Sequence, residues 1–322
     1  MDITLAIDRY DRHFPFFDGS LDQVEGLKIE PFQVGQSANL RDGNDRHERF
    51  LKGEFDVAEF SMSSFLAAKS KGIPIVGVPV FPRRLFSQSQ MWVRQDSGLV
   101  TPNDLAGKRV ALSAFQTTLS LLAKGDLEFH YQVPWRSIKW KTTTAEKIPL
   151  NLEPGVHVEF IGGRDRLGTL LMAGEIDAFF LPHPPANVMS GEVPARRLFL
   201  NPVEAEAEYF QNQGFFPIMH LIVMHQELAD CDPEMTLKLM ALFHQASDIA
   251  ENYYTDPNWS LLVGCRHHFE SERKLFNGSP WLRGFKANRK NIEVMIRYAK
   301  DQSIVSGELE PENLFSAIGL ET

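Results

Sequence analysis

Three segments that follow short apolar runs are rich in small hydrogen-bonding residues. They are Ser61, Ser63 and Ser64 after the run 57–60, Gln116, Thr117 and Thr118 after 109–112, and Gly162-Gly163-Arg164 after 158–161. If each run is a strand and each segment opens a helix, unpaired N–H groups and hydroxyls gather there and favour a carboxylate. The alternative is that these residues only cap their helices. Three such junctions in one chain indicate a shared anion site.

Arginines and histidines near other strand ends add charge and proton-transfer chemistry. Arg83 and Arg84 follow an apolar run and a proline, and one of them is a candidate clamp because a guanidinium pairs with both oxygens of a carboxylate. The competing interpretation is a surface pair bridged to acidic side chains. His220 precedes the apolar run 221–224 and His183 follows the run 178–181. A lone histidine is more often structural than catalytic, but its pKa near neutrality suits proton donation.

Motifs for several other chemistries are missing from the sequence. No His-x-x-x-His or Glu-x-x-His pair is present, so no metal site is predicted. There is also no Gly-x-Ser-x-Gly, no phosphate-binding loop, and no Gly-x-Gly-x-x-Gly after the first apolar run. Serine hydrolase, nucleotide hydrolase and simple dehydrogenase functions therefore have no support, and no cofactor is expected.

The candidate residues must be positioned by an alternation of short apolar runs and helical patterns. The expected strands are 3–7, 57–60, 75–81, 109–112, 158–161, 178–181 and 221–224. The expected helices between them run from 61 or 63 to 71, from 116 to 131 and from 165 to 173. This alternation predicts βαβ units and a mainly parallel sheet. Helical spacing in 239–253 and 292–299 predicts C-terminal helices, the first capped by Asp232 with Pro233 at its first position.

The length of 322 residues suggests two domains. Proline-rich stretches at 79–82 and 182–185 are the candidate crossovers between them. The prediction is therefore a first lobe made of residues 1–84 and 196–322 and a second lobe made of residues 85–195. Two α/β lobes joined by two extended crossovers would leave a cleft between them, where ligands are often bound.

Composition limits the partners and the compartment. The net charge of -9 argues against nucleic-acid and anionic-membrane partners, although a local pocket can still attract a small anion. No run of about 18 apolar residues is present, and the start has no signal-peptide pattern. The two cysteines lie outside any Cys-x-x-Cys pattern and are expected to be free thiols. The prediction is a cytoplasmic protein, although a mature periplasmic protein would look similar.

Several stretches together resemble the 4,5-dihydroxyphthalate decarboxylase family. They are 53–66, 79–86, 104–110, 174–178 and 216–220, with 8–12 and 18–19 near the start and 288–289 and 297–298 near the end. The resemblance implies a type II periplasmic-binding-protein fold, with two α/β lobes, a double crossover and a ligand between the lobes. It also implies cofactor-independent decarboxylation of an aromatic acid, and it adds Tyr10 and Arg12 to the substrate-binding candidates.

Three stretches depart from the family pattern. The family usually continues Phe-Arg-His where this chain has Phe86-Ser87-Gln88, and it often carries an arginine where this chain has His183. The Gly-Gly usually found after the tryptophan represented here by Trp140 is replaced by lysine and threonines. These departures fall on groups expected to touch the ligand, so they bear on the identity of the substrate.

The prediction is a cytoplasmic, cofactor-independent carboxy-lyase for a small hydroxylated aromatic or conjugated carboxylic acid, phthalate-like. Arg83 or Arg84, Ser61, Ser63, Ser64, Gln116, Thr117, Thr118, Tyr10 and Arg12 are expected to bind the acid. His220 is the expected proton donor, with Glu59 or His183 orienting the phenol, and Glu59 itself could be the acid if burial raised its pKa. The alternative is a non-catalytic solute-binding protein or sensor for an aromatic carboxylate. Self-association is compatible with either function.

Overall fold

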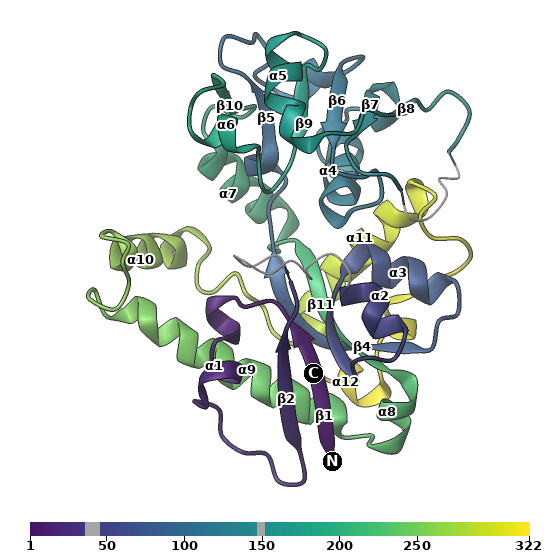
Figure 1. Cartoon of the computed structure of the whole chain (residues 1–322), viewed down its shortest axis with the longest axis vertical. Coiled ribbons are helices and arrows are strands. Elements are labelled where there is room, and N and C mark those ends of the chain that lie inside the picture. The colour runs from purple at the N-terminus through teal and green to yellow at the C-terminus, as the bar shows by residue number, and fades with distance from the viewer. Residues whose placement is uncertain (36–45, 147–151) are drawn as a thin grey trace. The chain divides into compact units, whose positions relative to one another are not determined.

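The computed structural model describes residues 1–35, 46–146 and 152–322. The chain divides into two units (Figure 1). Unit 1 consists of Met1–Arg84, Ile218–Ile292 and Glu310–Thr322, and unit 2 consists of Leu85–Pro217 and Glu293–Leu309. The chain leaves unit 1 after Arg84 and returns to it after Pro217, whereas the predicted second lobe ends at residue 195. The intervening helix α7 (Pro202–Gln213) stays with unit 2 because Tyr209 is buried there against Asp126 and Phe86.

Unit 1 is built on a five-stranded mixed sheet. Its order is β2 (Lys28–Gln33), β1 (Asp2–Ile7), β3 (Val57–Ser61), β11 (Ile218–His225) and β4 (Ile75–Arg84). β1 is parallel to both β2 and β3, whereas β11 is antiparallel to both β3 and β4. β3 and β11 are largely buried because each has a strand on either side.

Helices cover the sheet of unit 1. The long helix α9 (Met235–Thr255) buries Leu239, Leu242, Phe243 and Ala246 in one core with residues of β1, β3, β4 and β11. The other elements are α2 (Arg46–Leu51), α3 (Met62–Ser70), α8 (Gln226–Cys231), α10 (Cys265–Leu275), α12 (Ala317–Leu320), α1 (Pro15–Asp18) and the short turns η1 (Asp11–His13), η6 (Lys286–Asn288) and η7 (Pro311–Leu314). The helix α11 (Arg289–Asp301) passes from unit 1 into unit 2.

Unit 2 is built on a six-stranded mixed sheet. Its order is β10 (Ala195–Arg197), β5 (Met91–Arg94), β9 (Ala178–Phe180), β6 (Arg109–Leu112), β7 (Lys139–Thr142) and β8 (Val158–Phe160). The four strands from β9 to β8 are parallel, β5 pairs antiparallel with β9, and β10 pairs antiparallel with β5. The helices are α4 (Thr118–Phe129), α5 (Leu167–Met172), α6 (Ala186–Met189) and α7, with the turns η2 (Gln88–Gln90), η3 (Pro102–Leu105), η4 (Trp135–Ser137) and η5 (Arg164–Arg166).

The α/β class is confirmed, and each of the seven expected strands overlaps a strand of the structure. In unit 1, β2, β1, β3 and β4 run in one direction as expected of a mainly parallel sheet, and β11 runs antiparallel between β3 and β4. The expected cap of α9 is wrong, since this helix begins at Met235 and the Asp232 carboxylate pairs with Lys238. Within the described ranges, no helix has both the length and the apolar character needed to cross a membrane.

Candidate functional site

Glu59 is the centre of a hydrogen-bonded cluster in unit 1. Its side chain lies on β3 and is completely buried. Its Oε1 accepts a hydrogen bond of 2.8 Å from the Tyr10 hydroxyl and also pairs with Nδ1 of His220. Its Oε2 accepts a hydrogen bond of 3.2 Å from the backbone N–H of Asp8. These residues meet because β1, which leads to Asp8 and Tyr10, and β11, which carries His220, flank β3 on opposite sides.

Arg46 places a buried positive charge beside this carboxylate. It is the first residue of α2, and its side chain is only 6% exposed. Its Nε donates to the backbone carbonyl of Glu59 at 2.7 Å, and its Nη2 lies 3.5 Å from Oε1 of the same residue. A second nitrogen donates to the carbonyl of Val34 at 2.5 Å. The guanidinium is therefore held by backbone carbonyls in a position that compensates the buried negative charge.

These surroundings set the protonation states of the cluster. Burial alone would raise the pKa of Glu59, but Arg46 and His220 together hold it well below its ordinary value. Burial lowers the pKa of the His220 imidazole, against the opposing effect of the Glu59 carboxylate, and the positive charges of Arg83 and Arg46 lower it further. Burial raises the pKa of the Tyr10 hydroxyl, so it remains a hydrogen-bond donor. At neutral pH the cluster holds an ionised carboxylate beside a neutral imidazole.

Ser61, His220 and Arg83 are cross-strand neighbours beside this cluster. His220 on β11 is paired with Ser61 on β3 and with Arg83 on β4. The backbone pairing of β11 with β4 is irregular on both sides of His220. Glu59 is fully buried, whereas the other three side chains are partly exposed, with 15% of the His220 side chain accessible. The cluster is therefore buried at Glu59 and partly exposed at Ser61, Arg83 and His220.

The serines at the start of α3 do not act as ordinary caps. Ser61 precedes the helix, yet its side chain accepts no capping hydrogen bond from the helix N–H groups, and its hydroxyl donates to the hydroxyl of Ser64 at 2.8 Å. Its backbone N–H donates to Nε2 of His47 at 3.1 Å. Ser63 is buried. Of the three, Ser61 and Ser64 are partly exposed, and Ser61 is the cross-strand neighbour of His220.

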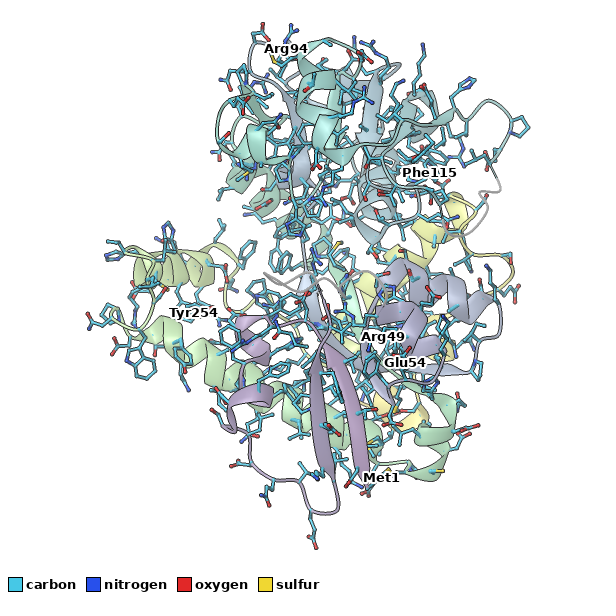
Figure 2. The ribbon with its side chains drawn as sticks, viewed as in Figure 1. Met1, Arg49, Glu54, Arg94, Phe115 and Tyr254 are labelled. Atoms are coloured by element: carbon cyan, nitrogen blue, oxygen red, sulfur yellow. The ribbon has the colours of Figure 1, made fainter. Side chains whose placement is uncertain are left out.

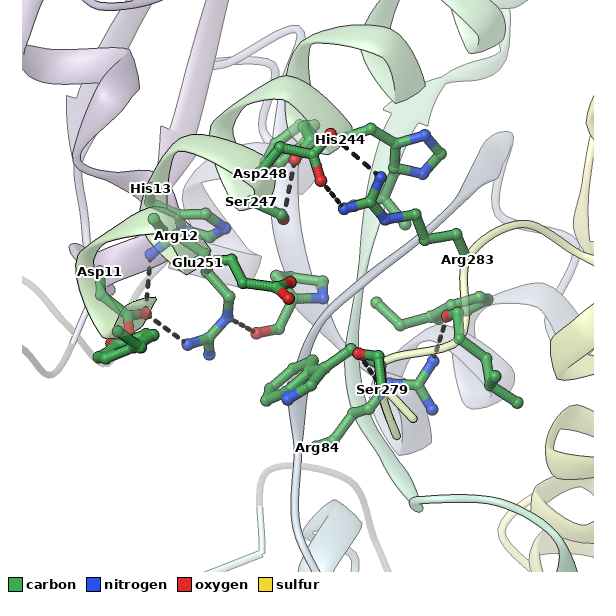
Figure 3. A pocket seen from close by; sticks show the side chains of 18 of the residues that line it. Asp11, Arg12, His13, Arg84, His244, Ser247, Asp248, Glu251, Ser279 and Arg283 are labelled. Carbon is green, nitrogen blue, oxygen red and sulfur yellow. Dashed lines mark hydrogen bonds and ion pairs between the residues drawn. The ribbon is translucent and has the colours of Figure 1, made fainter. Parts of the chain in front are cut away.

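Arg84 and Arg12 lie in different surroundings from Arg83. Arg84 is buried, and its Nη2 donates to the carbonyl of Leu282 at 2.9 Å and to the side-chain oxygen of Asn288 at 2.6 Å. Arg12 donates to the carbonyl of Pro82 at 2.5 Å. Both arginines line a separate pocket of unit 1 that does not include Glu59 or His220 (Figure 3). Of the expected carboxylate clamps, Arg83 alone is paired in register with His220.

The remaining candidates belong to unit 2. Gln116, Thr117 and Thr118 follow β6, and His183 follows the neighbouring parallel strand β9, so both segments leave the same edge of the sheet. Thr117 caps α4 by accepting from the N–H of Ser120 at 3.4 Å. The N–H of Phe115, labelled in Figure 2, donates to the carboxylate of Glu146. Glu146 therefore supplies an internal anion at the start of α4, where the sequence predicted a ligand carboxylate. His183 is exposed.

Arg46, His47 and Asp8 were missed by the sequence analysis. A carboxylate inside the apolar run 57–60 signals that a cation must lie nearby if the run is buried. Nothing in the polar stretch around Arg46 distinguishes it from an exposed helix start. Across the described part of the chain, no three His, Cys, Asp or Glu side chains are grouped as metal ligands would be.

Comparison with known proteins supports the resemblance seen in the sequence. The chain is 29% identical to 4,5-dihydroxyphthalate decarboxylase of Comamonas testosteroni over 332 aligned positions, covering 100% of this chain and 98% of that protein. It is 28% identical to 4,5-dihydroxyphthalate decarboxylase of Pseudomonas putida over 219 positions, covering 66% of this chain and 82% of that protein. The family model described as NMT1/THI5 like matches residues 33–125.

The fold is also found among solved structures. The periplasmic aliphatic sulphonate binding protein SsuA of Escherichia coli superposes with a TM-score of 0.62 and 12% sequence identity, covering 98% of this chain and 91% of that chain. At this identity the likeness concerns the fold alone. The predicted two-lobed α/β fold is thereby confirmed. Taken with the whole-length match, it also confirms the predicted family resemblance: this chain is similar to the 4,5-dihydroxyphthalate decarboxylases and has the fold of the periplasmic binding proteins.

Proposed function

We propose that this chain is a carboxy-lyase that removes CO2 from a hydroxylated aromatic dicarboxylic acid of the dihydroxyphthalate class. The observation that carries the proposal is the buried Glu59 carboxylate, whose Oε1 binds both Nδ1 of His220 and the hydroxyl of Tyr10. The names of the two curated relatives support the substrate class. No cofactor is invoked, because the hydroxyl of the substrate can supply the electron sink.

The reaction starts with a proton transfer from the substrate. Nδ1 of His220 faces the ionised Glu59, so the imidazole carries its proton there and Nε2 is a base. Nε2 takes the proton of a hydroxyl ortho or para to the leaving carboxylate, giving a phenolate. Glu59 stabilises the resulting imidazolium electrostatically, as a carboxylate beside a catalytic histidine does. Because burial lowers the pKa of His220, the imidazolium is a strong proton donor.

The second proton transfer goes to carbon. The imidazolium protonates the ring carbon that bears the carboxylate, which converts the phenolate into a cyclohexadienone. The bond from this carbon to the carboxylate then breaks, its electron pair restores the aromatic phenolate, and CO2 leaves. The phenolate takes one proton from solvent, so each turnover consumes one proton. Arg83 and the hydroxyls of Ser61 and Ser64 are proposed to hold the carboxylates during these steps.

The decisive experiment measures CO2 release from 4,5-dihydroxyphthalate, with phthalate as the control substrate that lacks the hydroxyls. His220→Gln is expected to lower kcat by about 10²- to 10⁴-fold with the fold intact, since glutamine can hydrogen-bond but cannot shuttle a proton. Arg83→Ala is expected to lower kcat/KM by roughly 30- to 1000-fold, and Arg83→Lys to restore only part of the loss. Turnover of the His220→Gln protein within a few-fold of the unaltered protein would contradict the proposal.

The second candidate function is a solute-binding protein for an aromatic carboxylate. It is favoured by the fold, which is shared with a sulphonate-binding protein. Direct binding of 4,5-dihydroxyphthalate without any CO2 release over hours would select this function. In that case His220→Gln should weaken binding by no more than the loss of one hydrogen bond, about tenfold.

A further inference from the structure

His13 is a buried histidine of unit 1 that the proposed reaction does not use. It lies in the turn η1, is labelled in Figure 3 and is only 1% exposed. Its ring packs against the rings of Tyr10, Phe16 and Phe243, at centroid distances of 5.0, 6.3 and 5.5 Å. Because the protein encloses the ring, His13 is not expected to exchange a proton directly with a substrate.

The hydrogen bond of the His13 ring goes to the backbone of Asp8. Nδ1 lies 2.7 Å from the carbonyl oxygen of Asp8, and since a carbonyl oxygen only accepts, Nδ1 carries the proton. Burial lowers the pKa of His13 to about 4, so the ring is neutral at neutral pH and its Nε2 is an acceptor. No group among the described residues donates to this buried Nε2. An unpaired buried nitrogen is costly, so packing alone does not account for a histidine at this position.

The segment from Asp8 to His13 connects this ring to the Glu59 cluster. The carbonyl of Asp8 accepts from the backbone N–H of Tyr10 at 3.2 Å as well as from the His13 ring, and the backbone N–H of His13 donates to the carbonyl of Tyr10 at 2.9 Å. The N–H of Asp8 donates to Oε2 of Glu59 at 3.2 Å, and the hydroxyl of Tyr10 donates to Oε1 at 2.8 Å. The segment that His13 closes therefore places two donors on the Glu59 carboxylate.

These two donors limit the negative charge that Glu59 presents to His220. Hydrogen bonds to a carboxylate stabilise its charge, so a carboxylate that loses donors attracts a proton on a neighbouring imidazole more strongly. Burial lowers the pKa of His220, and the Glu59 carboxylate opposes this effect. Loss of the donors from Asp8 and Tyr10 should therefore raise the pKa of His220, which makes its imidazolium a weaker acid.

We propose that His13 is a positioning residue of the Glu59 cluster, which fixes the segment from Asp8 to Tyr10, keeps two donors on Glu59 and so limits the charge that this carboxylate presents to His220. The consequence for catalysis rests on the proposed function, because it assigns proton transfer to His220. The link from His13 to His220 rests on the hydrogen bonds of Asp8, Tyr10 and Glu59 and holds for a binding protein as well.

Several other groups act on the pKa of His220, and substitutions at His13 leave all of them in place. The charged and titratable groups that surround it are Glu59 on β3, Arg83 on β4, Arg46 on α2, and Tyr10 and Asp8 on the segment before η1. His13 itself is neutral at neutral pH, so its replacement removes no charge from the cluster. A changed pKa of His220 in a His13 variant therefore reports the hydrogen bonds that the segment makes.

The test is an NMR titration of His220 in the full-length protein, its signal assigned by its absence in His220→Gln. His13→Leu removes the hydrogen bond to Asp8 and should raise the pKa of His220 by about half a pH unit or more. His13→Asn should restore the original pKa, since its amide N–H takes the place of Nδ1–H, whereas His13→Gln carries its amide at the position of Nε2 and should behave like leucine. His225→Leu, at a histidine of β11 stacked on Phe50, is the matched control and should leave the pKa unchanged.

Turnover separates this inference from the proposed function. If CO2 is released, His13→Leu should lower kcat about three- to tenfold and move the acid limb of the kcat/KM profile to higher pH, and His13→Asn should recover both. An unchanged pKa of His220 in folded His13→Gln, or an equal rise in His13→Asn or His225→Leu, would refute the positioning role whether or not CO2 is released. A rise confined to the leucine and glutamine variants at His13, without any CO2 release, would support the positioning role while the proposed function fails.

Discussion

Each unit contains a fully buried carboxylate that accepts hydrogen bonds from tyrosine hydroxyls, Glu59 in unit 1 and Asp126 in unit 2. The two carboxylates differ in their protonation. Glu59 in unit 1 faces Arg46 and His220, and these hold its pKa well below its ordinary value against the effect of burial. Asp126 in unit 2 lies on α4, and burial raises its pKa to about 7. The same type of group is therefore ionised at neutral pH in unit 1 and retains its proton up to near-neutral pH in unit 2.

The donors around Asp126 explain the difference. Its Oδ2 accepts from the hydroxyl of Ser87 at 2.6 Å, and its Oδ1 accepts from the hydroxyls of Tyr209 at 3.0 Å and Tyr298 at 3.1 Å. All three donors are neutral, so they oppose the effect of burial only in part. Ser87, Tyr209 and Tyr298 come from three distant stretches of chain, so Asp126 ties together the parts of unit 2. We infer that Asp126 stabilises the fold of unit 2 and that Glu59 takes part in the proposed reaction.

The largest expected effect is the loss of the cation beside Glu59. Arg46→Met leaves a buried carboxylate without its positive partner and should lower the free energy of unfolding by about 3–5 kcal/mol. The double variant Arg46→Met/Glu59→Gln should recover most of this loss, because no charge then remains buried. Urea unfolding at neutral pH measures both. A change below about 0.5 kcal/mol in the single variant, within the scatter of ordinary surface substitutions, would show that Arg46 does not compensate Glu59.

The next effect concerns the pH dependence of stability. Because the pKa of Asp126 rises from 3.8 unfolded to about 7 folded, the folded state binds the extra proton between these values. The stability contributed by Asp126 is thus complete below about pH 4 and is lost as the pH rises through 7. Asp126→Asn keeps acceptors and a donor for the three hydroxyls and abolishes this loss. It should exceed the unaltered protein in stability by on the order of 3 kcal/mol at pH 8 and match it near pH 4.

Asp96→Asn, at an exposed carboxylate of unit 2, is the control for that measurement. Urea unfolding of the three proteins across pH 4 to 8 gives the comparison. If the free energy of unfolding of Asp126→Asn and of the unaltered protein changed with pH in parallel, Asp126 would be ionised over the whole range, and the prediction would be contradicted. Glu59 should act in the opposite direction, since a lowered carboxyl pKa contributes stability that is present above its unfolded value and is lost as the pH falls.

The smallest effect compares the two tyrosines. Tyr298→Phe removes one of three donors to Asp126 and should cost about 1 kcal/mol of stability without changing CO2 release. Tyr10→Phe removes a donor to Glu59 at a similar cost in stability, but it should also lower kcat about tenfold, since it alters the carboxylate that orients His220. Equal kinetic effects in both variants would remove the distinction between a structural and a chemical carboxylate.

Much of the framework follows from local sequence patterns. The seven expected strands and the apolar face of α9 are found because alternating or helical spacing of apolar residues is a local property. Residue types in and beside the expected strands also made Glu59, Ser61, Arg83 and His220 candidates for the site. β2, β5, β7 and β10 were not expected from the sequence. They are short or carry polar residues, so their pairing depends on neighbouring strands rather than on their own pattern.

The tertiary structure decided which candidates meet. The return of β11 between β3 and β4 brings His220 beside Glu59, Ser61 and Arg83, and strand order is a long-range property that no local pattern encodes. The same arrangement separates Arg83 from its neighbour Arg84, which enters a different pocket. It also places the Glu146 carboxylate against the N–H of Phe115, just before α4, and places the Arg46 guanidinium beside Glu59. A single sequence shows the residue types available for chemistry, but only the packed chain determines which charges lie close enough to shift one another's pKa.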